Sequence, residues 1–199
     1  MSRCSNTIKS ERKTWIVQFL REKGLTSLLS GIHICKTESV RIFAFKVLNA
    51  IITTEPGLKA FVTLPAAFSP LILSVLGHVH NDELFEIFEI LAFVASAEPD
   101  EGYRLIIESF TSTQFSRIPL KPFVDLLLEK QISPPVKFKL LVLFNALVNT
   151  PDLLDDRQHV RQLLRSAHFN VACEALYREA NTARVQFDGV APTAMSTGP

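Results

Sequence analysis

Cysteine, glycine and long apolar runs are all scarce in this sequence of 199 residues. Its three cysteines, Cys4, Cys35 and Cys173, are odd in number and far apart, which excludes a disulfide scaffold and a CxxC zinc site. The most apolar stretch, residues 64–77, is too short to cross a bilayer and contains two prolines. Residues 1–20 are too polar for a signal peptide. We therefore expect a soluble cytoplasmic protein without an integral membrane segment.

An excess of charge of either sign is also missing. The chain has 21 Lys and Arg against 20 Asp and Glu, a net charge of +1, and no basic stripe is readable in it. Nucleic-acid-binding proteins concentrate basic charge on one face, so we expect no nucleic-acid partner. Apolar residues make up 47% of the chain, which is enough for one large or two small globular domains.

Motifs of catalysis and metal binding are lacking as well. The sequence contains no glycine-rich phosphate loop, no GxSxG and no HExxH. His78 and His80 form an HxH beside Asp82 and Glu83, which we interpret as a polar connection before a helix and not as a metal site. Asp155 and His159 are interpreted as a pair at i,i+4 that helps to start a helix. We expect no enzymatic activity, no metal and no cofactor.

Apolar residues recur at helical spacing along almost the whole chain, and prolines fall between the apolar stripes. This pattern predicts an all-α fold of about eleven helices joined by short connections. We expect residues 1–10 to be a flexible segment, residues 11–182 to be the folded domain and residues 183–199 to be a disordered tail. The predicted helices cover residues 11–21, 25–33, 39–54, 57–63, 67–77, 82–97, 101–112, 120–130, 134–149, 155–167 and 169–182.

Three similar segments suggest an internal repeat. VLNAIITT, ILAFVASA and LFNALVNT begin at residues 47, 90 and 143, which are 43 and 53 residues apart, and each closes a long predicted helix. Such a period is typical of armadillo and HEAT repeats, which stack into right-handed superhelical arrays. An irregular helical bundle is the alternative interpretation.

In an array, the last helix of each repeat lines a concave surface, and equivalent positions stack into a ladder along it. Steps of four within the three segments and their flanks predict a ladder that mixes apolar and small polar groups. An uncharged stripe of this kind suits the apolar face of a partner helix. The alternatives are a solvated groove without a ligand and Asn side chains that satisfy neighbouring backbone groups. The ladder consists of Phe45, Asn49 and Thr53, then Phe88, Ala92 and Ser96, then Leu141, Asn145 and Asn149. The buried face is expected to hold Val47, Leu48, Ile51, Ile90, Phe93, Val94, Leu143 and Leu147.

A family resemblance lies in residues 138–176. There FNAL (144–147) is followed by a short acidic loop and by LDDRQHVR (154–161). This stretch resembles the end of the armadillo-type regulatory domain of diaphanous-related formins, also called the formin homology 3 (FH3) or diaphanous inhibitory domain. WIVQFLREKGLTSLL from Trp15 and VLNAIITTEPGLKAF from Val47 resemble earlier segments of that domain, so the likeness covers about residues 11–180 in order.

The resemblance implies a binding domain without catalysis, in the cytoplasm and associated with the actin cytoskeleton. In the family, the concave surface holds a helix from the formin's own C-terminal autoregulatory segment, and a GTP-loaded Rho-family GTPase displaces it to permit actin assembly. Because only residues 1–10 precede the first predicted helix, we expect GTPase binding here to be weak or partial. Matched by position, the peptide-contacting residues are Asn49, Thr53, Phe88, Leu91, Ala92 and Asn145, and the ladder adds Asn149.

Two positions depart from the family pattern. The family often carries Lys where Asn49 stands and Ala where Phe88 stands, and Phe88 is expected to fill part of the groove. Either the partner helix differs from that of the family, or the peptide site is altered or lost. The alternative function is therefore an armadillo-type adaptor that binds an unrelated helical peptide.

Overall fold

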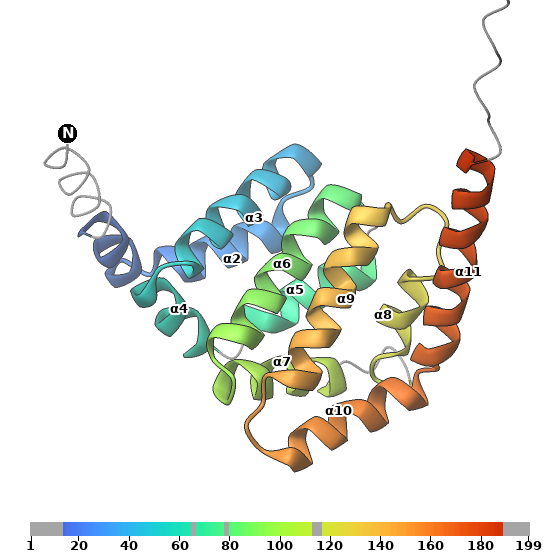
Figure 1. The fold of residues 1–199 in the computed structure, drawn as a ribbon. Helices are drawn as coiled ribbons and strands as arrows, with labels where there is room; N and C mark the ends of the chain where they lie inside the picture. Colours follow the sequence, from blue (N-terminus) through green and yellow to red (C-terminus); the bar gives the residue numbers. More distant parts are fainter. Residues whose placement is uncertain (1–13, 65–66, 78–79, 113–116, 189–199) are drawn as a thin grey trace, which may run out of the picture.

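The computed structural model describes residues 14–64, 67–77, 80–112 and 117–188, and it confirms the all-α class. In these ranges all regular secondary structure is helical. A helix over residues 14–21 precedes the labelled elements of Figure 1. These are α2 (Gly24–Ile34), α3 (Glu38–Ile52), α4 (Glu55–Val62), α5 (Phe68–Gly77), α6 (Asn81–Ala97), α7 (Glu101–Ser112), α8 (Lys121–Leu126), α9 (Pro134–Asn149), α10 (Leu154–Ser166) and α11 (Phe169–Asp188).

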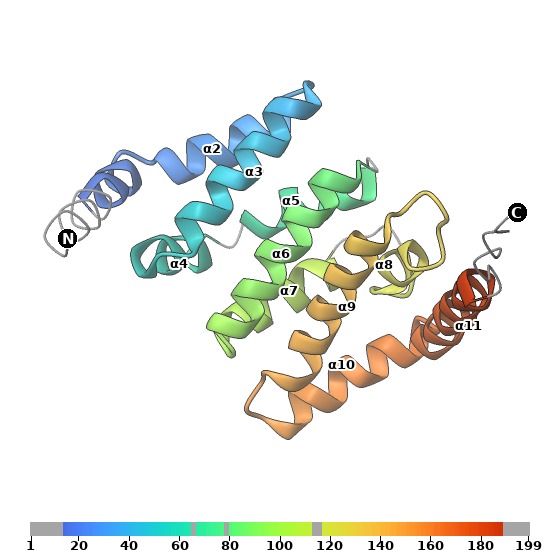
Figure 2. The same cartoon turned by 45° about the horizontal axis from the view of Figure 1, so that its top comes forward.

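The three long helices α3, α6 and α9 lie side by side and run in the same direction (Figures 1 and 2). Behind them, α2 packs on α3 and α5, and α5 packs on α6. At their carboxyl ends, α4 contacts α3 and α7, while α7 contacts α6. Two shorter helices followed by a long one thus occur twice, as α4–α5–α6 and α7–α8–α9. The right-handed superhelix of an armadillo array stays a prediction.

Phenylalanine rings fill the core between these layers. Phe61 of α4 meets Phe68 of α5 edge to face, with ring centroids 4.9 Å apart. Phe110 of α7 meets Phe123 of α8 in the same geometry at 4.5 Å. All four rings are fully buried. Because such pairs add to the stabilisation from burial, the same aromatic contact fixes the first two helices of both three-helix units.

Two polar contacts set the positions of α3, α6 and α9 at their amino ends. Arg41 of α3 donates two hydrogen bonds to the carboxylate of Glu83 on α6, at 2.6 and 3.0 Å. Asn81 accepts a hydrogen bond from the backbone N–H of Ser133 at 2.7 Å and donates one to the carbonyl of Gln131 at 3.1 Å. These contacts tie the start of α6 to α3 on one side and to the loop before α9 on the other.

The observed helix ends differ from the expected ones at two places. α8 ends at Leu126, whereas residues 120–130 were expected to be helical. α11 continues to Asp188, so the expectation of a disordered tail was wrong for residues 183–188. The rest of that tail and the expected flexible segment 1–10 lie outside the described residues.

Candidate functional site

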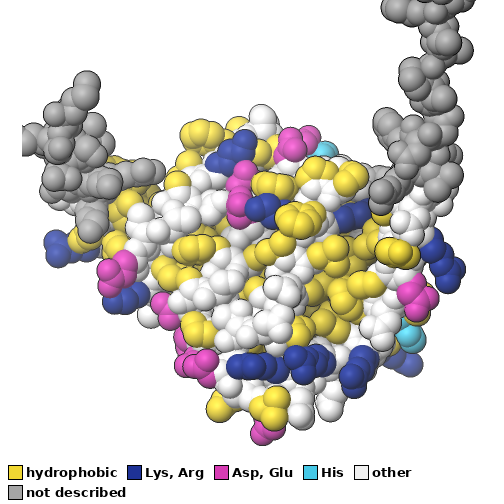
Figure 3. Space-filling view, viewed as in Figure 1, with side chains coloured by type: hydrophobic (Ala, Val, Ile, Leu, Met, Phe, Trp, Pro, Cys, Tyr) yellow, Lys and Arg dark blue, Asp and Glu magenta, His cyan; other side chains and the backbone are white. Residues whose placement is uncertain are grey.

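A shallow groove crosses the face formed by α3, α6 and α9. It consists of two adjoining depressions of about 350 and 420 Å³. In Figure 3, hydrophobic and uncharged side chains cover most of the middle of this face, and Lys and Arg side chains follow its lower edge. We call this surface the α3–α6–α9 groove, and its lining residues are Lys46, Asn49, Ala50, Thr53, Glu86, Glu89, Ala92, Phe93, Ser96, Lys139 and Val142.

Glu89 of α6 connects the three helices across the groove. Its Oε1 accepts a hydrogen bond from Lys139 Nζ of α9 at 2.7 Å, and its Oε2 accepts one from Asn49 Nδ2 of α3 at 3.3 Å. The Lys139 ammonium also lies 4.9 Å from the centre of the Phe85 ring, a cation–π distance. The carboxylate and the ammonium of this bridge therefore neutralise each other within the groove.

The hydroxyl groups of the groove are bonded within their own helices. Thr53 Oγ1 donates to the carbonyl of Ala50 at 3.1 Å, and Ser96 Oγ donates to that of Ala92 at 2.9 Å. On α9, Asn149 Nδ2 donates to Asn145 Oδ1 at 2.8 Å. The Asn145 amide nitrogen makes no hydrogen bond in the described ranges, and the residue is exposed, so its donors are available to a ligand or to water.

Three of the seven predicted site residues, Asn49, Thr53 and Ala92, line the groove. Asn145 and Asn149 are exposed on α9, one and two turns beyond Val142, but they line neither depression. Phe88 and Leu91 are 0% exposed, so their assignment to the groove was wrong. The expectation that Phe88 fills part of the groove fails for the same reason.

The geometry of the helix explains these errors. A step of four residues turns an α-helix by about 400°, so each step drifts by about 40° from the starting direction. The ladder that starts at Phe45 and Phe88 therefore begins in the core, where both rings are fully buried. It turns outward along the helices, so that Asn49 and Ala92 line the groove and Thr53 and Ser96 are exposed. Phe93, which was expected in the core, lines the groove instead.

Sequence reasoning missed the charged and apolar residues Lys46, Glu86, Glu89, Lys139 and Val142. A signal for two of them was present, because Glu83, Glu86 and Glu89 recur every third residue in an otherwise apolar helix. Carboxylates are seldom buried without a partner, so this spacing indicates an interhelical polar seam. Its partners on α3 and α9 are distant in sequence, and the spacing alone does not identify them.

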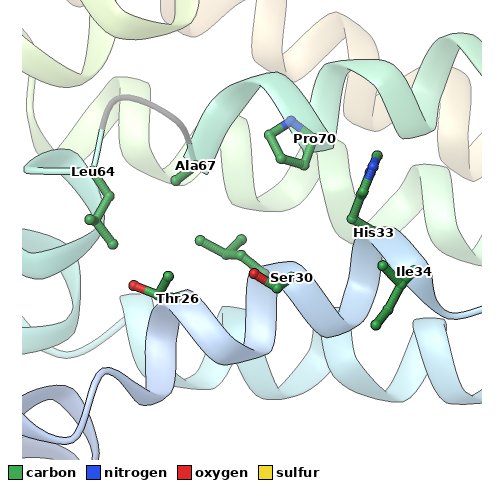
Figure 4. Close-up of a pocket in the computed structure, with 8 residues that line it drawn as sticks. Thr26, Ser30, His33, Ile34, Leu64, Ala67 and Pro70 are labelled. Atoms are coloured by element: carbon green, nitrogen blue, oxygen red, sulfur yellow. The ribbon is translucent and has the colours of Figure 1, made fainter.

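A second hollow lies between α2 and the start of α5, and its volume is about 390 Å³ (Figure 4). Thr26, Ser30 and His33 project into it from α2, opposite Leu64 and Pro70. It shares no lining residue with the α3–α6–α9 groove. The sequence contained no signal for it.

The described residues offer little reactive chemistry. No group of three His, Cys, Asp or Glu side chains among them could hold a metal ion. Burial raises the pKa of the Cys173 thiol, which lowers the fraction of reactive thiolate. None of the helices in the described ranges combines the length and the apolar character needed to span a bilayer.

Comparison with protein-family models gave no match to this chain. Comparison with curated proteins gave no match either.

Proposed function

We propose that this chain is a non-catalytic regulatory domain that binds an amphipathic helix in the α3–α6–α9 groove. By its resemblance to the formin FH3 region, the occupant is the C-terminal autoregulatory helix of a formin, and a Rho-family GTPase competes with its binding. In this proposal the domain controls actin filament assembly from the cytoplasm, in association with the cytoskeleton, and its link to actin is indirect.

The observation that carries the proposal is the lining of the groove. Phe93 and Val142 supply apolar surface, and Ala92 lets a partner backbone approach closely. Outside the two depressions, Asn145 offers amide donors one turn beyond Val142 on α9. A partner helix recognised through apolar anchors with a few polar contacts needs this combination. A catalytic site needs instead a nucleophile and a base in contact, and the lining residues do not include such a pair.

Exposed aromatic side chains extend this surface. Phe138 is one turn before Val142 on α9, and Phe43 is three residues before Lys46 on α3; both rings are largely exposed. Solvent-exposed aromatic groups next to a groove are typical of protein interaction surfaces. We therefore expect the partner helix to extend beyond the two depressions toward the amino ends of α3 and α9.

Calorimetric titration with a formin C-terminal autoregulatory peptide tests the proposal. We expect micromolar or tighter binding, reduced at least about tenfold by Val142→Asp, since a charge would then face the apolar side of the bound helix. Asn145→Asp should also weaken binding, because it removes the amide donors. Val171→Asp is the matched control, since Val171 is exposed on α11 and far along the chain from the groove residues.

Titration with a GTP-loaded Rho-family protein tests the second partner, and we expect it to displace the peptide. If the folded chain binds neither the peptide nor the GTPase, the formin proposal is wrong. An adaptor for an unrelated helical peptide would then be the better interpretation of the groove.

A further inference from the structure

Glu86 of α6 is a largely buried residue whose carboxylate has no bonding partner among the described residues and reaches solvent in the groove. The residue is only 9% exposed, and its side chain opens into the smaller depression of the groove, between α3 and α6. Within the described ranges it makes no hydrogen bond and no ion pair. A carboxylate that faces a narrow depression without a protein donor is an acceptor site for a cation that enters the depression.

The neighbouring glutamates on α6 show the contrast. Glu83, one turn earlier, is held by both hydrogen bonds from Arg41. Glu89, one turn later, accepts hydrogen bonds from Asn49 and Lys139. Only the middle carboxylate of this row of three lacks a donor among the residues that the structure describes.

Among the described residues, Lys46 is the one cationic side chain that lines the same depression. It is exposed, and its ammonium makes no ion pair with any described carboxylate, which places it beyond 4.0 Å from Glu86. Asn49 and Thr53, the neutral lining residues on α3, use their donors on Glu89 and on Ala50. In the part of the chain that the structure describes, the depression therefore offers a free acceptor and no donor bonded to it.

We propose that the helix bound in the groove inserts a basic side chain between α3 and α6, where it pairs with Glu86. Arginine fits this site best, because the guanidinium is weakly hydrated, stays charged when buried and bonds a carboxylate through two N–H groups. This inference rests on the proposed function, and it adds the chemistry of one position of the partner helix.

A small probe tests the cation site without any peptide. N-ethylguanidinium is titrated into the ¹⁵N-labelled chain while the amide signals of α3 and α6 are followed by NMR, and neutral N-ethylurea is the reference probe. We expect saturable shifts at Ala50, Thr53 and Glu86 with the guanidinium only. Glu86→Gln should abolish them, and Glu174→Gln, at an exposed glutamate on α11, should leave them unchanged. If the shifts are absent in the parent chain, or survive in Glu86→Gln, the inference is wrong.

The peptide test uses the formin C-terminal peptide with each arginine replaced in turn by citrulline, its neutral isostere, and each lysine by norleucine. At one peptide position we expect the replacement to lower the affinity for the parent chain about tenfold. The same replacement should leave the affinity for Glu86→Gln unchanged, because the peptide charge then has no partner to lose. Lys46→Met should leave or increase the affinity of the parent peptide, since it removes a competing cation.

The two proposals fail in different ways. A peptide that binds the parent chain and Glu86→Gln equally well supports the proposed function and overturns the inference. A chain that does not bind the peptide but binds ethylguanidinium through Glu86 overturns the formin partner and supports a basic side chain in the occupant.

Discussion

Gly57 lies directly against the carbonyl oxygen of Ile51, so a Cβ atom at Gly57 would stand only 2.0 Å from that oxygen. This close approach lets α4 start immediately after the end of α3. Gly102 repeats the relationship at the next junction, where a Cβ atom would lie 2.7 Å from the carbonyl oxygen of Val94. Both glycines belong to the first turn of a helix that follows a long one. At both junctions the absence of a side chain lets the new helix pack directly against the backbone of the preceding one.

Gly57→Ala should therefore destabilise the chain, although alanine is the better helix former. The added methyl group overlaps backbone atoms, which cannot move without shifting α4 against α3. We expect a loss of at least about 2 kcal/mol in the free energy of unfolding, measured by urea denaturation.

Gly31→Ala is the matched control. Gly31 lies inside α2, and a Cβ atom there would meet nothing within 4 Å. The substitution should raise the free energy of unfolding by about 0.5–1 kcal/mol, because alanine loses less backbone entropy in a helix. Equal effects of the two substitutions would contradict the steric argument.

A second prediction concerns the ion pair between Arg41 and Glu83. Glu83 is 1% exposed, so Glu83→Gln leaves the guanidinium beside a neutral group in a nearly dry site. We expect a loss of about 2–4 kcal/mol in the free energy of unfolding. The double variant Arg41→Met with Glu83→Met should be more stable than either single one, since no buried charge is left unpaired.

Glu108→Gln provides the comparison at an exposed pair. Glu108 binds Arg104 at 2.8 Å on the surface of α7, and both side chains are more than half exposed. Such pairs contribute at most about 1 kcal/mol, so the denaturation midpoint should barely change. A large loss of stability in Glu108→Gln and a small loss in Glu83→Gln would contradict the argument that the buried ion pair matters more than the exposed one.

The sequence predicted the helices well because their signals are local. Apolar spacing and proline positions depend on a few neighbouring residues, and α9 begins and ends at the predicted residues 134 and 149. Asn81 shows the limit of this reasoning. It is the first residue of α6, and its side chain bonds to the loop before α9. The spacing of apolar residues around Asn81 does not indicate a bonding partner about fifty residues away in the sequence.

The groove was predicted less well than the helices because its lining depends on the register between helices. Thr53 and Ala92 line the groove, but steps of four placed Phe88 in the groove instead of the core. Glu89 belongs to the groove only because Asn49 and Lys139 reach it from α3 and α9. This three-helix contact follows from packing over long sequence separations, and periodicity within one helix does not contain it.

A third prediction tests the assigned faces of α3. Ile51 is fully enclosed between α3 and α4, so Ile51→Asp would bury a charge without a partner. We expect this variant to be unfolded at 25 °C, as measured by circular dichroism, because the cost exceeds about 4 kcal/mol. Val40→Asp, at an exposed position of the same helix, should melt like the parent chain. Similar melting of both variants would mean that the assigned faces are wrong.

The last prediction concerns alkaline pH. Tyr103 of α7 is 5% exposed, and its hydroxyl donates a hydrogen bond to the backbone carbonyl of Asp156 at 3.0 Å, which joins α7 to α10. Burial, assisted by the negative charge of Asp156, raises the pKa of Tyr103 from 10.0 to about 12. The unfolded chain therefore loses this proton at lower pH than the folded chain.

It follows that the stability due to Tyr103 is complete below pH 10 and is lost as the pH rises toward 12. We expect Tyr103→Phe to be less stable than the parent at pH 8 by about 1 kcal/mol, because the hydrogen bond is lost. Between pH 10 and pH 12 the melting temperature of the variant should fall less steeply than that of the parent. Tyr177→Phe, at an exposed tyrosine on α11, should keep the steep fall of the parent. Parallel profiles for the parent and Tyr103→Phe would show that the buried phenol does not control the alkaline transition.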